Sequence, residues 1–370
     1  MKGTLWSKSK IAAAALFALC FCSSTMPAPT RAATGDVHEK GAHENVVFEN
    51  YSPLAASEEQ QRRLLTPLLA KALQEHVAAS GQALSERSMD LSREHFSYYV
   101  PHCEEPASGY RVLVFVPPWQ RATLPHAWFA VLDRHATILV TAAASGNEEN
   151  VIGRRIPLAL AGYENIAGRF PVDASRVWIG GLSGGSRVAQ RIALAYPDLF
   201  HGALLNAGSD RFGTPELPFP PAPLLQRVEE GTRLVYATGT RDESNLAADR
   251  ASRDSAQRFC IADLRELPMR NAGHALLDAG TLDRALSALE AERSPPGSLD
   301  ICRTERTRVV DEAITRVETS LARGDHQTAQ VELTSLDARF GALALPQSLQ
   351  LAQRIAQATH AAAAASAVSR

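Results

Sequence analysis

Four glycines surround one serine in the stretch VWIGGLSGGSR at residues 177–187, which constrains the fold more than any other part of the sequence. Residues 177–179 favour a strand, and residues 187–196 favour a helix that ends before Pro197. A run that gives up four side chains leaves room for a tight turn and for close approach of the backbone. The stretch therefore predicts a strand, a sharp turn at Ser183 and a helix.

Short aliphatic or β-branched runs alternate with helical periodicity over residues 97–292. The expected strands cover 111–116, 136–144, 176–180, 202–205, 233–238 and 263–268, and the expected helices cover 127–134, 155–169, 183–196, 244–259 and 281–292. This alternation predicts an α/β fold with a mostly parallel central sheet covered by helices on both faces.

The flanking regions and one internal segment have a different texture. Residues 33–53 are polar and aperiodic and predict a loose lead-in, whereas apolar spacings of three and four predict one helix over 58–77. Five prolines at 213–225 predict a surface excursion without a strand or helix, near the carboxyl ends of the strands. After 294–298 the chain is rich in alanine and predicts helices, the last of them near 346–356.

The beginning of the chain has the order of a secretory signal. Lysines precede an apolar run at 11–22, and small residues follow up to an expected cleavage after Ala32. An uncleaved anchor is the alternative, although the run is short for a bilayer. The sequence thus predicts an exported protein, periplasmic or extracellular, without other membrane attachment. The expected parts are a signal peptide at 1–32, a lead-in and helix at 33–96, the α/β domain at 97–293 and a C-terminal helical extension at 303–370.

Composition narrows the classes of partner and cofactor. The 370 residues carry a formal net charge of −2 and show no cluster of Lys and Arg, so we expect no nucleic-acid partner. The sequence has no metal-ligand cluster, phosphate loop or dinucleotide fingerprint, and we expect neither a metal nor an organic cofactor. After export, Cys103, Cys260 and Cys302 could form at most one intramolecular disulfide, and their spacing does not choose the pair.

Residues 181–185 match G-x-S-x-G, a turn that exposes a serine hydroxyl between a strand and a helix. A serine becomes a nucleophile when a base takes its proton and a third group orients the base. His274, in the loop after the last expected strand, is the expected base, and a plain surface histidine is the alternative. Asp242 follows the preceding strand and is the expected acid, with Asp210 and Glu243 as alternatives.

An oxyanion beside the serine would need two backbone donors. The expected donors are the N–H of Gly184 and the N–H of Trp119, the first residue after Pro117 and Pro118 that can donate; Trp119 could instead form a pocket wall. The side chains expected to shape the pocket are Ser145, Asn147, Phe212 and Phe219, although each fits an ordinary loop residue equally well.

Taken together, these residues resemble the α/β-hydrolase superfamily, and within it the secreted esterase and polyhydroxybutyrate-depolymerase-like group that includes feruloyl esterases. The resemblance rests on residues 172–200, on GTRD at 239–242 and on AGH at 272–274, and it covers about 97–292. It implies a Ser-His-Asp hydrolase of carboxylic esters, small or oligomeric, that needs no metal or organic cofactor. No polymer-binding domain is recognisable, so we do not expect action on insoluble polymer.

Two other functions remain open from the sequence. One is a serine peptidase that uses the same triad on small peptides. The other is a non-enzymatic scaffold whose C-terminal helices, at 303–370, bind a protein partner. Packing against the α/β domain is the simpler role for these helices.

Overall fold

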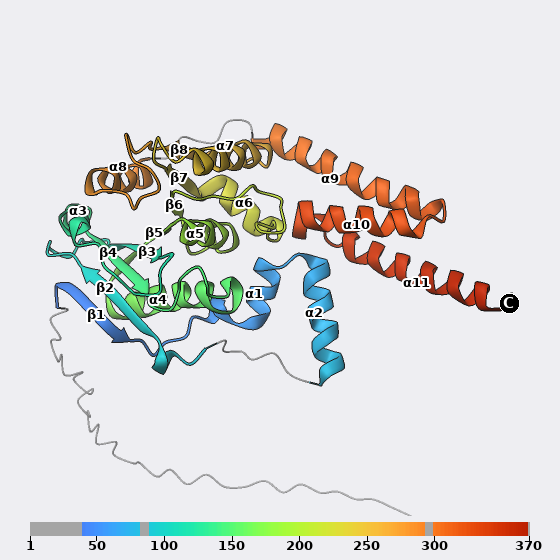
Figure 1. Cartoon of the computed structure of the whole chain (residues 1–370), viewed down its shortest axis with the longest axis horizontal. Helices are drawn as coiled ribbons and strands as arrows, with labels where there is room; N and C mark the ends of the chain where they lie inside the picture. Colours follow the sequence, from blue (N-terminus) through green and yellow to red (C-terminus); the bar gives the residue numbers. More distant parts are fainter. Residues whose placement is uncertain (1–38, 82–88, 293–298, 369–370) are drawn as a thin grey trace, which may run out of the picture. The chain divides into compact units, whose positions relative to one another are not determined.

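The computed structural model describes residues 39–81, 89–292 and 299–368. The signal peptide expected at 1–32 lies outside these residues. The residues from Glu39 onward form one compact unit, in which helices lie against an eight-stranded sheet (Figure 1).

The sheet has the strand order β1-β2-β4-β3-β5-β6-β7-β8. β2 pairs antiparallel with β1 and with β4, and the pairs from β4 to β8 are all parallel. The strands are β1 (Gly41–Val47), β2 (His95–Val100), β3 (Tyr110–Val116), β4 (Thr137–Ala142), β5 (Val172–Leu182), β6 (Gly202–Asn206), β7 (Arg233–Ala237) and β8 (Leu264–Glu266). The predicted fold, a mostly parallel sheet with helices on both faces, is confirmed.

The first strand corrects one expectation. Residues 33–53 were expected to be a loose lead-in, but β1 pairs with β2 along the edge of the sheet. Its sequence GAHENVV is largely solvent-facing and interrupted by a register shift between His43 and Val46. An edge strand is held by main-chain hydrogen bonds to one neighbour, so it needs no apolar run that a sequence pattern would reveal.

Two hydrophobic clusters lie on opposite faces of the sheet. Successive residues of β3 point to opposite sides, so Val112 and Val114 belong to one cluster and Leu113 and Phe115 to the other. The first cluster packs under α4 (Ile156–Arg169), α5 (Gly184–Ala195), α6 (Ala222–Gly231) and α7 (Glu243–Arg258); the second packs under α3 (Phe129–Arg134) and α8 (Ala279–Glu290). Burial on both faces explains why the central strands read as unbroken apolar runs.

Prolines set two helix boundaries that the sequence analysis misplaced. The single helix expected over 58–77 is two helices, α1 (Ser57–Leu64) and α2 (Pro67–Ser80), because the residue before a proline avoids helical angles. The proline-rich excursion was expected to hold no helix, yet α6 begins inside it at Ala222. Pro223 is tolerated there because first-turn N–H groups have no partner within the helix.

Five short helices of about one turn lie between the longer elements of the described residues. They are η1 (Pro53–Ala55), η2 (Leu91–Arg93), η3 (His126–Trp128), η4 (Val151–Arg155), which has π-type hydrogen bonding, and η5 (Gly341–Ala344).

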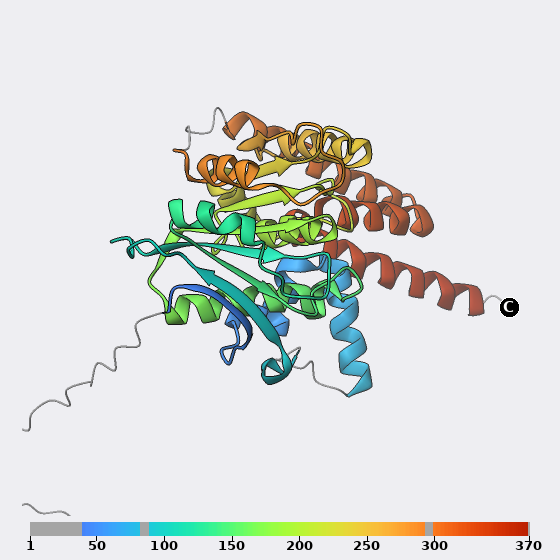
Figure 2. The same ribbon diagram turned by 60° about the vertical axis from the view of Figure 1, so that its left-hand side comes forward.

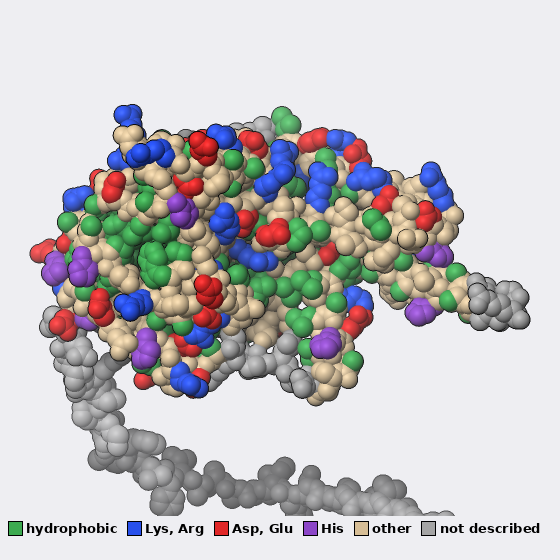
Figure 3. All heavy atoms as spheres, viewed as in Figure 1, with side chains coloured by type: hydrophobic (Ala, Val, Ile, Leu, Met, Phe, Trp, Pro, Cys, Tyr) green, Lys and Arg blue, Asp and Glu red, His purple; other side chains and the backbone are tan. Residues whose placement is uncertain are grey.

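The C-terminal helices are α9 (Leu299–Ala322), α10 (His326–Phe340) and α11 (Gln347–Val368). Figure 1 and Figure 2 both show α10 between α9 and α11. Positive and negative side chains are interspersed along α9 (Figure 3), where Arg308, for example, lies between Glu305 and Glu312. None of the helices within the described ranges is long and apolar enough to cross a membrane.

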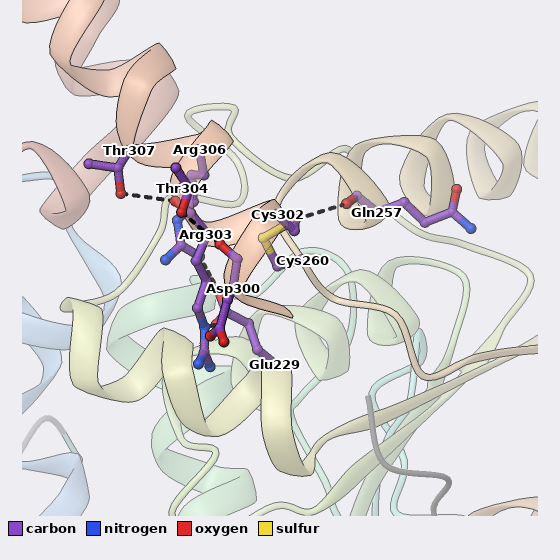
Figure 4. The surroundings of a disulfide bond; sticks show 9 residues. All are labelled: Glu229, Gln257, Cys260, Asp300, Cys302, Arg303, Thr304, Arg306 and Thr307. Carbon is purple, nitrogen blue, oxygen red and sulfur yellow. Dashed lines mark hydrogen bonds and ion pairs between the residues drawn. A yellow bond between two sulfur atoms is a disulfide. The ribbon is translucent and has the colours of Figure 1, made fainter. Parts of the chain in front are cut away.

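A disulfide and a buried ion pair attach these helices to the α/β domain (Figure 4). Cys260, just after α7, is bonded to Cys302 of α9, whereas Cys103 is a free thiol. The Glu229 carboxylate of α6 is fully buried and accepts hydrogen bonds from Arg303 and Arg306 of α9. The pairing that the sequence left open is therefore Cys260 with Cys302.

Candidate active site

Ser183 occupies the turn between β5 and α5 with φ 57° and ψ −121°. A non-glycine residue rarely adopts these angles, and holding one there costs about 1–3 kcal/mol. The turn is fixed on both sides, because Ser183 N–H donates to the Asn206 carbonyl at 2.8 Å and the Ser183 carbonyl accepts from Arg187 N–H at 3.2 Å. The backbone thus places the serine at the carboxyl end of the central strand and at the N-terminus of a helix.

The glycines beside Ser183 have no room for a side chain. A β-carbon on Gly181 would lie 2.4 Å from the Gly185 carbonyl carbon, and one on Gly185 would lie 2.0 Å from the Val116 oxygen. A β-carbon on Gly184 would lie 2.2 Å from Asn147 Oδ1. The expectation that the glycines leave room for a tight turn and for close approach of the backbone is therefore confirmed.

His274 and Asp242 form a direct pair. His274 lies in the loop between β8 and α8, and its Nδ1 is 2.7 Å from Oδ2 of Asp242, the residue just before α7. The Asp242 side chain is 7% exposed and that of His274 47% exposed. Burial would raise the pKa of Asp242, but hydrogen bonds from His274 and Asn245 outweigh it and hold this pKa below its usual range. An ionised Asp242 makes Nδ1 the donor and leaves Nε2 for proton transfer.

The two alternative acids do not contact His274. Asp210 accepts a hydrogen bond from Arg187 Nε at 3.1 Å, and Glu243 is an exposed residue in the first turn of α7. Among the carboxylates that the sequence suggested, the structure brings only Asp242 to the histidine.

Asn206, which the sequence analysis did not select, connects the serine turn to the histidine loop. It is fully buried at the end of β6, and its backbone oxygen accepts from Ser183 N–H. Its Nδ2 donates to the carbonyls of Ala237 at 2.9 Å and Ala275 at 3.2 Å, and its Oδ1 accepts from Leu277 N–H at 2.9 Å. The only sequence signal is an amide at the end of the apolar run GALLN.

These contacts bring Ser183, Asp242 and His274 to the same end of the sheet. The three residues follow β5, β7 and β8, and β6 lies between β5 and β7. Within the described residues, no hydrogen bond joins Ser183 Oγ to His274. Bonds between a catalytic serine and its base often tighten only once substrate is bound. The site as it stands consists of a formed Asp–His pair and a serine on a strained turn.

The loop after β3 packs against the serine turn, as shown by the closeness of the Val116 oxygen to Gly185. Trp119 lies in this loop, directly after Pro118. The Pro118 carbonyl accepts a hydrogen bond from Asn147 N–H at 3.1 Å. Gly184, the first residue of α5, has an N–H without a partner inside the helix. The structure thus places the two expected oxyanion donors on segments that adjoin Ser183.

The four expected pocket residues lie in different surroundings. Asn147 is exposed and adjoins Gly184, whereas Ser145 is 2% exposed and its carbonyl accepts from Arg155 Nε at 2.9 Å. Phe212 and Phe219 are buried in the core, where the Phe219 ring lies 4.3 Å from the ring of Phe259.

The expectation for the two phenylalanines is thereby corrected. Ala342 N–H donates to the Phe219 carbonyl, so this part of the excursion is held against the C-terminal helices. Apolar side chains on a surface excursion commonly serve to anchor it. Of the four, only Asn147 is exposed beside the serine turn. The described residues contain no group of His, Cys, Asp and Glu that could hold a metal ion.

Comparison with known proteins found no matching family model and no matching curated protein. Solved structures are similar in fold. S-formylglutathione hydrolase (FrmB) from Staphylococcus aureus has a TM-score of 0.40 at 15% identity, over 53% of this chain and 92% of its own. Acetyl xylan esterase from Aspergillus awamori has a TM-score of 0.41 at 12% identity, over 53% and 94%.

A longer protein from Bacteroides ovatus has a TM-score of 0.37 at 15% identity, over 52% of this chain. The present chain spans only 33% of its length. Similarities at such identities concern the fold alone. The strand order, the parallel pairing from β4 to β8 and the serine turn after β5 are those of the α/β-hydrolase fold, and the chain has that fold.

Proposed function

We propose that the protein is a serine hydrolase that cleaves carboxylic esters, with Ser183 as nucleophile, His274 as base and Asp242 as the acid that orients the base. The observation that carries this proposal is the 2.7 Å pair of His274 and Asp242 at the same sheet end as Ser183 on its strained turn. The choice of esters rests on the sequence resemblance at residues 172–200, 239–242 and 272–274.

The mechanism follows from the positions of these groups. Ser183 Oγ attacks the acyl carbon while His274 Nε2 takes the hydroxyl proton, and Asp242 stabilises the imidazolium through Nδ1. The N–H groups of Gly184 and Trp119 donate to the oxyanion, and the positive end of α5 adds to its stabilisation. When the intermediate collapses, His274 returns the proton to the departing alcohol, and the acyl group stays on Ser183.

The second half of the cycle repeats these roles with water. His274 takes a proton from a water molecule that attacks the acyl-enzyme carbonyl, and the carboxylic acid leaves as the proton returns to Ser183. No group other than the three side chains and the two backbone donors has to move a proton or hold charge.

A fluorophosphonate probe, which labels activated serines, tests the nucleophile directly. We expect the full chain to be labelled and Ser183→Ala to remain unlabelled, with ester hydrolysis reduced by at least about 10⁴-fold in the variant. Equal signals from the two folded proteins, or none from either, would contradict the proposal. A chromogenic ester and an amide with the same acyl group then separate an esterase from a peptidase.

We further propose that the protein is exported. The lysines, the apolar run at 11–22 and the small residues up to Ala32 support a cleaved signal, and a disulfide between Cys260 and Cys302 suits an oxidising compartment. N-terminal sequencing of the protein recovered from the producing cells, with periplasm and medium analysed separately, tests the cleavage and the destination. An intact Met1 would contradict cleavage.

A further inference from the structure

Asn245, three residues after the proposed catalytic acid, donates to both oxygens of its carboxylate. Asn245 lies in the first turn of α7 and is only 9% exposed. Its Nδ2 is 3.0 Å from Asp242 Oδ1 and 2.8 Å from Oδ2. The second oxygen is also the acceptor for His274 Nδ1 at 2.7 Å, so two N–H groups converge on it.

The opposite end of the amide is held by a cation from the nucleophile helix. Arg187 Nη2 donates to Asn245 Oδ1 at 3.2 Å, while Arg187 Nε donates to Asp210 Oδ1 at 3.1 Å. Arg187 belongs to the first turn of α5, and its N–H donates to the Ser183 carbonyl. A continuous path of hydrogen bonds therefore runs from the serine turn to the acid.

The chemistry of the two partners fixes the orientation of the Asn245 amide. A guanidinium has only donors and an ionised carboxylate only acceptors, so the oxygen must face Arg187 and the NH₂ group must face Asp242. In this orientation Asn245 stabilises the ionised form of Asp242 more than the protonated form, which has fewer acceptor sites. Either a flipped amide or a protonated Asp242 would lose a hydrogen bond inside a buried site, where an unmade bond costs more than at the surface.

We propose that Asn245, oriented by Arg187, is a positioning residue that keeps the Asp242 carboxylate ionised and aimed at His274. This inference rests on the proposed function, because only that function gives the pair of Asp242 and His274 a catalytic role. Asn245 acts through Asp242. Its Nδ2 also lies 3.1 Å from His274 Nδ1, but both groups are donors while Asp242 is ionised, so they do not bond to each other.

The charges around the pair agree with this role. The groups that face Asp242 are His274 from the loop after β8 and, through Asn245, Arg187 from α5 with its partner Asp210. The pKa of Asp242 lies below its usual range, and the Asn245 hydrogen bond is one of the causes. Burial raises the pKa of Asp210 in spite of its hydrogen bond from Arg187.

The decisive variant is Asn245→Asp, which keeps the shape of the side chain and replaces its donors by acceptors. Asp242 then faces a like charge about 3 Å away, and one of the two carboxyls must hold its proton to a higher pH. We expect ¹³C NMR titration of the carboxyl carbons to show the Asp242 signal titrating at least about one pH unit higher than in the parent. Ester hydrolysis should lose about 10–100-fold in kcat, with KM unchanged, and its acid limb should move to higher pH.

Two further variants keep the test decisive. Asn165→Asp is the matched control, because Asn165 is a buried amide of α4 that bonds to backbone groups far from the pair; it should cost stability and leave the acid limb in place. Arg187→Gln removes the cation that orients the amide and should shift the Asp242 titration in the same direction by a smaller amount. If Asn245→Asp does not fold, the Asp242 titration of Arg187→Gln decides the test.

The outcomes separate this inference from the proposed function. An Asp242 titration and an acid limb that stay at the parent's values in folded Asn245→Asp, or in Arg187→Gln if that variant alone folds, would overturn the positioning role. If the parent hydrolyses no ester and takes no fluorophosphonate, the proposed function fails, but the NMR titration still decides whether Asn245 holds the carboxylate.

Discussion

The turn that presents Ser183 and the loops that carry Asp242 and His274 meet at one end of the sheet, but they are built by different means. The turn is held by backbone geometry, with glycines packed where no β-carbon fits and a serine in a strained conformation. The loops are joined to each other by backbone hydrogen bonds, such as Arg241 N–H to the Ala272 carbonyl. The side chains of Asn206 and Asn245 add the hydrogen bonds that fix the histidine loop to β6 and orient the Asp242 carboxylate.

The difference teaches what each region tolerates. Backbone packing fails when an atom is added, because carbonyl groups cannot move aside without breaking the strand or helix to which they belong. Hydrogen-bonded loops fail when a donor or acceptor is removed, and they do so gradually, since water can replace part of what is lost. The two regions should therefore respond to opposite kinds of substitution.

The largest expected effect comes from adding one carbon to the turn. In Gly185→Ala the new β-carbon would lie 2.0 Å from the Val116 oxygen, so β3 and α5 would have to separate. We expect a loss of more than about 4 kcal/mol in the free energy of unfolding, or no folded protein at all. Urea unfolding followed by circular dichroism measures the loss.

Gly273→Ala is the matched control in the histidine loop, beside His274. No atom lies within 4 Å of a β-carbon built on Gly273. We expect its free energy of unfolding to stay within about 0.5 kcal/mol of the parent. Equal stability losses in the two variants would contradict the contrast between a packed turn and an open loop.

An intermediate effect should follow when the loops lose a side chain that holds them. Asn206→Leu keeps a branched side chain but is larger, and it leaves the Ala275 carbonyl and the Leu277 N–H without their partner. The Ala237 carbonyl loses one of its two donors and keeps the N–H of Ala207. We expect a loss of about 3 kcal/mol, since each buried unpaired group costs about 1–3 kcal/mol and water recovers part of it. Displacement of His274 should slow fluorophosphonate labelling of Ser183 by about 100-fold.

Asn165→Leu is the control for Asn206, because Asn165 is 1% exposed and bonds to Asn50 and Ala161. It should lose similar stability but label at the parental rate while folded. Labelling of Asn206→Leu at the parental rate would show that the histidine loop keeps its position by other contacts.

The two regions also differ in how far the sequence predicts them. Glycine spacing around Ser183 encodes the turn locally, because each glycine marks a place where the backbone needs room, and the strand-helix pattern around it set the sheet. His274 and Asp242 were selected by their order after the strands, and the structure places them 2.7 Å apart. Whether they act in catalysis stays a prediction.

What the sequence did not predict depends on contacts between distant residues. Nothing local marks Asn206 or Asn245, because an asparagine at a strand end or in a first helical turn is common wherever it stands. The edge strand β1 lacks an apolar pattern. Phe219 looked like a pocket residue because its partners, the Phe259 ring and the Ala342 N–H of η5, lie far along the chain.

The smallest expected effect is a pH-dependent change in stability at α8, the helix that follows the histidine loop. His135, just before β4, has a side chain 11% exposed, with Nδ1 2.9 Å from Glu290 and Nε2 3.1 Å from Asp283, both on α8. Arg111 also faces Glu290, and Arg134 also faces Asp283. The hydrogen bond to Glu290, opposed by burial and assisted by Asp283, raises the pKa of His135 above its usual 6.5.

Because the folded protein raises the pKa of His135, protonation of this histidine stabilises the fold. The contribution is complete below pH 6.5 and is lost as the pH rises through the higher pKa of His135 in the folded protein. His135→Asn should thus lower the melting temperature by about 2 °C near pH 5.5, which corresponds to about 1 kcal/mol, and by clearly less near pH 9. His76→Asn, an exposed histidine of α2, should show no such trend. Because α8 begins just after His274, losing the His135 contacts should loosen the histidine loop and leave the Ser183 turn intact. A difference in melting temperature that grows as the pH rises would contradict this prediction.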